Sequence, residues 1–146
     1  MSNFSKTPDG LPFLCGGYIS TEEFSGYSDA CYKYFPLNDS WQEMSTMPSE
    51  RYDSAYTYSD GFGLVMAGGD LRDGSEMDSV ILTKDGLTFE TLQSLPTPSN
   101  RGCLASIGQS TLLLSGGAPN DRSYEVYSYD IAGDTWTRYH GEITVL

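Results

Sequence analysis

The sequence has few of the residues that carry most catalytic and metal chemistry, since its 146 residues include one histidine and three cysteines. Positive charge is also scarce, because 8 lysines and arginines stand against 20 aspartates and glutamates, for a formal net charge of −12. A field of that sign repels nucleic acid and anionic membrane surfaces, and it attracts basic patches on other proteins. We therefore expect a protein partner, and neither nucleic acid nor membrane.

The sequence also lacks an apolar run of the roughly 18 residues that a membrane-spanning helix needs. Its first ten residues, MSNFSKTPDG, contain no apolar core of the length found in secretory signals. These absences predict a cytoplasmic protein. In that compartment the cysteines are expected to be reduced structural thiols. Cys15 and Cys31 fall on successive expected strands, however, so a disulfide between them is the alternative.

Long stretches show no helical period, whereas a pattern of another kind occurs three times. In each copy an apolar run ends in a glycine pair, and these pairs recur at a spacing of about fifty residues. A second β-forming run follows, and an aromatic residue stands seven positions after its central residue. The glycine pairs begin at Gly16, Gly68 and Gly116, the central residues are Tyr34, Leu82 and Tyr129, and the aromatic residues are Trp41, Phe89 and Trp136.

Turn dipeptides divide each copy into strands. Asp60-Gly61 and Asp85-Gly86 are typical of tight hairpins, and Gly133-Asp134 stands at the corresponding place in the last copy. Each full unit is therefore expected to have four antiparallel strands, and the fold class is all-β.

Glycine pair, tyrosine and tryptophan at this period resemble the kelch repeat, whose units are the blades of a β-propeller. The resemblance implies an N-terminal tail over 1–10, a first blade over 11–48 that lacks its inner strand, complete blades over 49–97 and 98–140, and a C-terminal tail over 141–146. The glycines and large aromatic residues are then core residues and not ligand-binding ones.

About two and three-quarter blades make an incomplete ring, because propellers close with about four to eight. An open arc leaves apolar sheet faces in water, which indicates a partner or aggregation. We favour a fragment of a larger propeller. Self-association through the open blade faces and attachment to another protein are the alternatives.

The longer loops, of which the longest is expected from Tyr18 to Asp29, all lie at one end of the expected strands, where binding residues usually concentrate. Arg51 and Arg101 are each followed four residues later by an alanine, Ala55 and Ala105, and this spacing aligns the two arginines with each other. They match an arginine that kelch repeats place at the start of the inner strand, and the resemblance implies that they grip acidic peptides. An ion pair with Glu50, Asp53 or another loop acid is the structural alternative. The remaining candidate partner-binding residues are Arg122, Arg72, Phe24 and Tyr27.

The function expected from the resemblance is protein recognition without a cofactor. The alternative is a propeller enzyme, either a kelch-type copper oxidase or a sialidase-like hydrolase. His140 is the single histidine, whereas the copper site of such oxidases needs two imidazoles. The sialidase turn signature is missed by one residue of spacing near both Phe89 and Trp136, so enzyme function is not the favoured interpretation.

Overall fold

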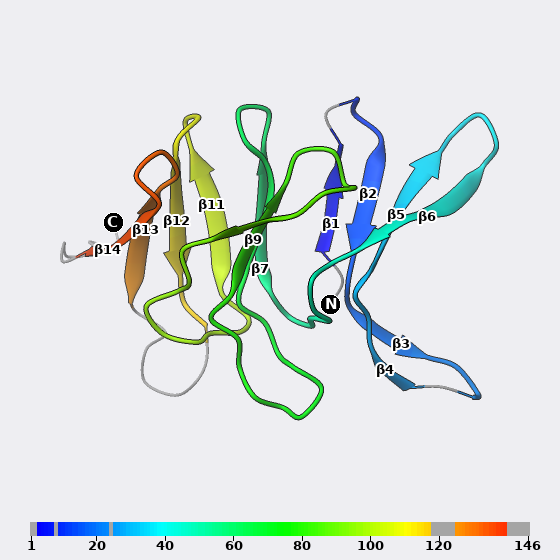
Figure 1. Cartoon of the computed structure of the whole chain (residues 1–146), viewed down its shortest axis with the longest axis horizontal. Helices are drawn as coiled ribbons and strands as arrows, with labels where there is room; N and C mark the ends of the chain where they lie inside the picture. Colours follow the sequence, from blue (N-terminus) through cyan, green and yellow to red (C-terminus); the bar gives the residue numbers. More distant parts are fainter. Residues whose placement is uncertain (1–2, 8, 24, 118–124, 140–146) are drawn as a thin grey trace, which may run out of the picture.

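The computed structural model describes residues 3–7, 9–23, 25–117 and 125–139, and within these it consists of β-strands joined by turns and loops. The strands form three four-stranded antiparallel sheets and one separate hairpin (Figure 1). The first sheet contains β1 (Asn3–Lys6), β2 (Pro12–Cys15), β5 (Ala30–Phe35) and β6 (Ser40–Thr46). The second contains β7 (Ala55–Ser59), β8 (Gly63–Ala67), β9 (Val80–Thr83) and β10 (Glu90–Leu92). The third contains β11 (Cys103–Ile107), β12 (Thr111–Ser115), β13 (Val126–Asp130) and β14 (Thr135–Tyr139).

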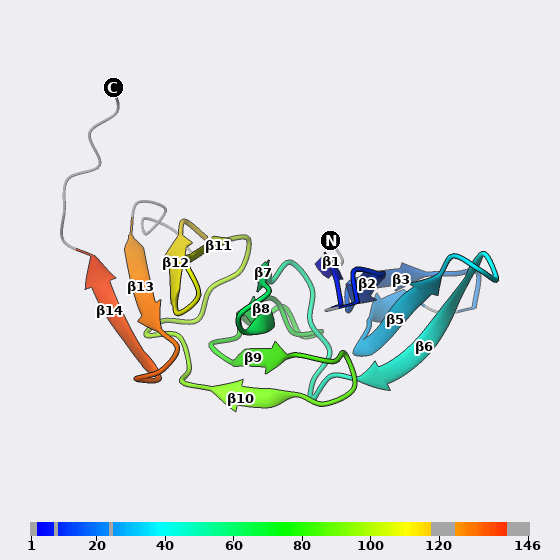
Figure 2. The same cartoon turned by 90° about the horizontal axis from the view of Figure 1, so that it is seen from above.

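The three sheets lie side by side and fan out from their first strands (Figure 2). β7 contacts both β1 and β11, so the first strands of neighbouring sheets lie next to one another. The last strands, β6, β10 and β14, lie at the opposite edges of the fan, as Figure 2 shows. The all-β expectation with four-stranded antiparallel units is confirmed, and the sheets do not close into a barrel.

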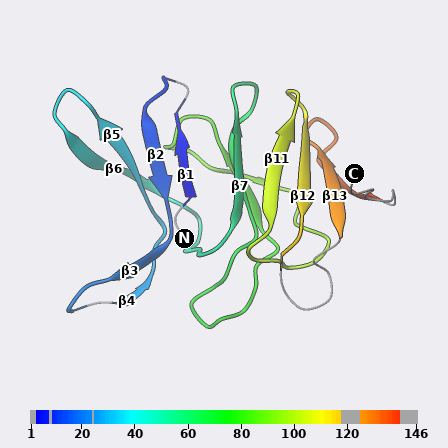
Figure 3. The ribbon, with the colours of Figure 1, turned by 180° about the vertical axis from the view of Figure 1, so that it is seen from behind.

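Two expectations about the first 30 residues are wrong. Residues 3–6 are not part of a tail, because β1 pairs antiparallel with β2 and supplies the inner strand that the first unit was expected to lack. The expected long loop from Tyr18 to Asp29 contains a hairpin of β3 (Tyr18–Ser20) and β4 (Ser25–Tyr27). This hairpin projects away from the first sheet, as seen from behind in Figure 3.

The middle sheet is covered on both faces, and β8 shows why its sequence is continuously apolar. All five of its residues are buried. Val65 and Ala67 pack in a core cluster with the third sheet, while Leu64 and Met66 pack in a second cluster with the first sheet. A strand buried on both faces needs apolar residues at every position, unlike the alternating pattern of β2 or β12.

Specific hydrogen bonds add to this packing between neighbouring sheets. The Trp136 indole Nε1–H donates to the carbonyl oxygen of Gln93 at 2.9 Å, which ties the third sheet to the second. The Ser45 hydroxyl donates to the carbonyl oxygen of Gly86 at 2.7 Å, which ties the first sheet to the second. Trp136 therefore acts at a sheet–sheet interface, as expected for a core residue, whereas its counterpart Trp41 is 45% exposed.

Cys15 and Cys31 form a disulfide, so the expectation of reduced thiols is wrong for this pair. The two residues are direct partners in the β2–β5 ladder, with Cα atoms 4.2 Å apart, and both side chains are fully buried. Cys103 is a free and exposed cysteine. In the described part of the chain, no helix is long and apolar enough to cross a membrane.

Removing the disulfide is expected to lower the free energy of unfolding by about 3 kcal/mol. The bond closes a loop with a sequence separation of 16, and a loop of that size restricts the unfolded chain by about this amount. The measurement is urea unfolding of the Cys15→Ala/Cys31→Ala double variant. Cys103→Ala is the matched control, because it removes an exposed thiol that makes no disulfide. Equal unfolding midpoints for the wild type and the double variant would contradict the bond.

Candidate interaction surface

The loops next to the glycine pairs meet at one end of the first and second sheets. Tyr52 and Asp70 form an antiparallel bridge in which each backbone N–H donates to the other residue's carbonyl, at 3.2 and 2.7 Å. Asp70 also pairs with Glu76 in a second isolated bridge. These bridges hold the segment before β7 against the loop between β8 and β9. The N–H of Gly17, just after the end of β2, donates to the carbonyl of Arg51 at 3.0 Å, which holds the first sheet against the same segment.

Three tyrosines form an aromatic cluster on this surface. The ring of Tyr27 stacks on that of Tyr52, with centroids 5.1 Å apart and planes inclined by 15°. Tyr18 meets both rings edge-on, at 6.0 Å from Tyr27 and 6.2 Å from Tyr52. The Tyr18 side chain is 52% exposed, and its hydroxyl hydrogen-bonds to the Ser25 hydroxyl at 2.5 Å. The cluster therefore offers a large apolar area with polar edges to a ligand.

Carboxylates lie beside the tyrosine cluster. Asp70 is buried, and its Oδ1 accepts a hydrogen bond from the Asn100 side-chain amide at 2.5 Å. Desolvation, and then the negative charge of Asp70, raise the pKa of Tyr27. Desolvation and the same charge raise the pKa of Glu76. Within the described residues, the buried Asn100 Oδ1 has no hydrogen-bond donor in reach. The surface is thus rich in acceptors and negative charge.

Arg101 lies on this surface, paired with an acid. Its Nε donates to Asp53 Oδ2 at 3.0 Å, and its backbone N–H donates to the Asp53 carbonyl at 2.8 Å. The hydrogen bond and charge of Asp53 raise the pKa of Arg101. Two-thirds of the Arg101 side chain is exposed, compared with a tenth of Asp53. The pair flanks an open groove of about 560 Å³ between β7 and β11, whose wall includes Tyr56 and Leu104.

Arg51 is not on the surface. Its side chain is fully buried, and its guanidinium donates to the Gly68 carbonyl at 3.3 Å and to the Ser79 hydroxyl at 3.1 Å. Desolvation lowers its pKa to about 10, so it remains charged at neutral pH. The structure therefore places Arg51 in the interior, where a partner cannot reach its side chain. Its hydrogen bonds go to Gly68 and Ser79, and not to the carboxylates of Glu50 or Asp53 that the alternative named.

The two arginines are not equivalent in the repeat. The N–H of Gly17 donates to the Arg51 carbonyl, and the N–H of Gly69 donates to the Ser99 carbonyl in the same way. Ser99 is thus the counterpart of Arg51. Arg101 lies two residues further on and is the counterpart of Asp53, with which it shares a left-handed backbone, at φ of 55° and 53° respectively.

The other predicted site residues are only partly brought together. Tyr27 is in the tyrosine cluster, stacked on Tyr52 and close enough to Asp70 and Asp53 for their charges to raise its pKa. Arg72 is exposed in the loop between β8 and β9. Phe24 and Arg122 lie outside the described residues. The sequence analysis did not identify Tyr18 or Tyr52, although the two tyrosines next to Gly17 and Arg51 were a usable signal.

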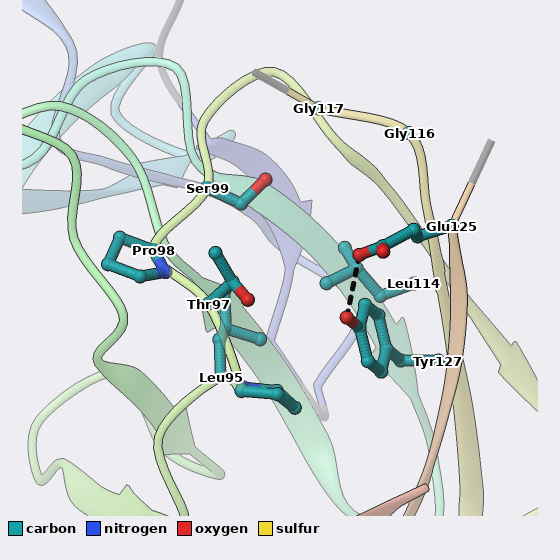
Figure 4. A pocket seen from close by; sticks show the side chains of 10 residues that line it. Leu95, Thr97, Pro98, Ser99, Leu114, Gly116, Gly117, Glu125 and Tyr127 are labelled. Carbon is teal, nitrogen blue, oxygen red and sulfur yellow. Dashed lines mark hydrogen bonds between the residues drawn. The ribbon is translucent and has the colours of Figure 1, made fainter. Parts of the chain in front are cut away.

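A small cavity lies between the second and third sheets (Figure 4). Its place in the repeat corresponds to the site of Arg51, because Ser99, the counterpart of Arg51, lines it. Ser99 leaves about 20 Å³ there, room for about one water molecule. Glu125 lines the cavity and accepts hydrogen bonds from the Tyr127 hydroxyl at 2.7 Å and from Arg138 at 3.0 Å. The cavity is too small for a ligand, so the surface around the tyrosine cluster is the better candidate site. Among the described residues, no group of three histidine, cysteine, aspartate or glutamate side chains is placed to hold a metal ion.

No protein-family model matches the chain, and no curated protein matches it in sequence. A solved structure, described as "Structure of YjhT", is similar in fold, with a TM-score of 0.80 and 14% sequence identity. The match covers 99% of this chain and 52% of that one. The chain therefore spans about half the length of a structure that shares its arrangement of strands.

Proposed function

We propose that the chain is part of a kelch-type β-propeller that acts as a protein interaction module, and that the surface around Tyr18, Tyr27 and Tyr52 binds a basic segment of its partner. The observation that carries the proposal is the tyrosine cluster beside Asp70 and Asp53, in which Tyr18 is exposed and Tyr27 and Tyr52 are half-buried. Lysine and arginine side chains are attracted both to tyrosine ring faces and to carboxylates.

The charge of the whole chain supports the same choice of partner. A formal net charge of −12 attracts basic proteins and raises the rate at which they associate. The acidic partner expected from the resemblance depends on Arg51 and Arg101. Arg51 is buried, and Arg101 is paired with Asp53, so little positive charge remains on this surface for an acidic peptide.

Nothing in the described residues favours the alternative of a propeller enzyme over protein recognition. The cytoplasmic location stays a prediction from the sequence. The Cys15–Cys31 disulfide weighs against it, because such bonds persist mainly in oxidising compartments. We therefore place the proposed interaction in an oxidising compartment.

The proposed function predicts that Tyr27→Ala weakens binding of a basic peptide by about tenfold or more, since aromatic anchors dominate such interfaces. The measurement is fluorescence anisotropy with two labelled peptides of equal length, one rich in lysine and arginine and one rich in aspartate and glutamate. The wild type is expected to prefer the basic peptide, and this preference should fall as salt is raised.

Tyr139→Ala is the matched control, because Tyr139 is 56% exposed on β14, in the third sheet, and belongs to no part of the tyrosine cluster. It is expected to bind the basic peptide as the wild type does. Equal affinity for the two peptides, or an unchanged affinity in folded Tyr27→Ala, would contradict the proposal.

A further inference from the structure

Among the residues that the structure describes, nothing covers one face of each end sheet. On the first sheet, the uncovered face carries Leu14, Tyr32, Tyr34 and Trp41, and we call it the upstream face. On the third sheet, the uncovered face carries Cys103, Ala105, Ile107 and Leu113, and we call it the downstream face. Trp41 is 45% exposed and Ile107 is 52% exposed.

The upstream face repeats the residues that the other two sheets bury. Counted from the glycine pairs, Leu14 corresponds to Met66 and Leu114, which are 0% and 4% exposed in the two internal interfaces. The pair Tyr34 and Trp41 likewise corresponds to Tyr129 and Trp136, since each tyrosine lies opposite its tryptophan in the strand ladder.

The similarity extends to the turn that receives the neighbouring sheet. The Tyr129 hydroxyl donates to Asp134, and Asp134 accepts the backbone N–H of Gln93 from the second sheet at 2.7 Å. In the first sheet, the Tyr34 hydroxyl donates to Asp39 at 2.6 Å. Asp39 and Asp134 share a left-handed backbone, with φ of 46° and 47°. The upstream face is thus shaped to receive another sheet edge.

The downstream face repeats the opposite side of the same interface. Cys103 corresponds to Ala55, Leu113 to Val65 and Ser115 to Ala67, because each pair occupies the same position in the ladder next to the glycine pair. Ala55, Val65 and Ala67 are buried against the third sheet. The upstream face therefore matches one side of the interface between neighbouring sheets, and the downstream face matches the other side. If the two faces met, they would form one more interface of the same kind.

We infer that a second copy of this chain covers both faces, so that two half-rings close into a six-sheet ring with the upstream face of each copy on the downstream face of the other. The inference rests on the proposed propeller organisation. A two-fold axis satisfies all four faces with one kind of contact. The match covers 52% of the YjhT chain, so two copies of this chain together have about the length of that one.

The test is the solution mass of the purified chain, measured by sedimentation velocity over a hundredfold range of concentration. The expected result is a discrete species with twice the mass of one chain. Leu14→Arg on the upstream face and Leu113→Arg on the downstream face are each expected to give a folded monomer. Leu87→Arg is the control, since Leu87 is half-exposed in the turn between β9 and β10 of the middle sheet, which lies at neither end of the fan, and this variant should remain a dimer.

The exposed thiol of Cys103 gives an independent readout. In the dimer it should be covered, as Ala55 is, so its alkylation should be at least about tenfold slower in the wild type than in Leu14→Arg. A monomeric wild type would overturn the inference, as would a dimer that Leu113→Arg leaves intact. A monomer that still prefers the basic peptide would overturn the dimer alone and leave the proposed function standing.

Discussion

Arg51→Ala is expected to lower the free energy of unfolding by about 4 kcal/mol, because the guanidinium is fully buried and bonded to the second sheet. Removing it leaves a cavity and deprives the Gly68 carbonyl and the Ser79 hydroxyl of a charged partner. The measurement is equilibrium unfolding in urea. Binding of the basic peptide by the fraction that remains folded should change little.

Arg101→Ala is the matched control for this prediction. Its side chain is two-thirds exposed and paired with Asp53 in water, and such ion pairs contribute about 0 to 1 kcal/mol. The sequence-based hypothesis treats the two arginines alike and expects both variants to lose partner capture at nearly unchanged stability. Equal and small losses of stability would favour that hypothesis over the buried position of Arg51.

Gly68→Ala is expected to cost about 4 kcal/mol or more. Gly68 has a left-handed backbone, with φ of 63°, which alone costs an L-residue about 1 to 2 kcal/mol. The added Cβ would also collide with the carbonyl oxygen of Ser99, which already accepts the N–H of Gly69 at 2.8 Å. The loop from Ser99 into the third sheet would have to move, and the packing of Leu95 would move with it.

Gly74→Ala separates the collision from the backbone strain. Gly74 also has a left-handed backbone, with φ of 82°, but a Cβ there meets nothing within 4 Å. We expect a cost of about 1 kcal/mol for this variant. Thermal and urea unfolding of the two variants side by side give the comparison. Similar destabilisation by both would show that close approach at the glycine pair is unimportant.

The repeat made most of the fold predictable from the sequence. The apolar runs before the glycine pairs became β2, β8 and β12, and Phe89 and Trp136 became interface residues, because both features depend on local pattern and burial. Trp41, at the same position of the first copy, is 45% exposed. The strand β1 was missed, since Asn3–Lys6 is short and mostly polar. The Asp9-Gly10 turn signal just before β2 was available and indicated a hairpin.

The candidate site was less predictable, because it depends on the register between segments. Arg51 and Arg101 were aligned through Ala55 and Ala105, yet β7 and β11 pair with β8 and β12 in a register that makes Ala55 the counterpart of Cys103. Counting back from the glycine pairs would have placed Arg51 opposite Ser99. Arg51 is buried because it contacts Gly68 and Ser79, which lie far from it in the sequence, whereas Arg101 is exposed. The residues next to each arginine do not determine this difference.

Local sequence patterns did not predict the tyrosine cluster, because its members come from separate segments of the chain. Tyr18 and Tyr27 are brought together by the β3–β4 hairpin, and Tyr52 joins them from the segment that leads into the second sheet. The sequence left the disulfide as an alternative to reduced thiols. The bond forms because Cys15 on β2 and Cys31 on β5 are direct partners in the strand ladder.

Each sheet is made of strands that follow one another along the chain, and among the described strands only the β3–β4 hairpin is inserted, between β2 and β5. The first sheet is complete at Thr46, before the second begins at Ala55. During synthesis, all four strands of the first sheet can therefore pair before the second sheet has been made, and closing such short loops is fast. The apolar face of the first sheet that packs on β8 stays exposed to water until the second sheet is made. The order of translation therefore sets the order in which the two core clusters are buried.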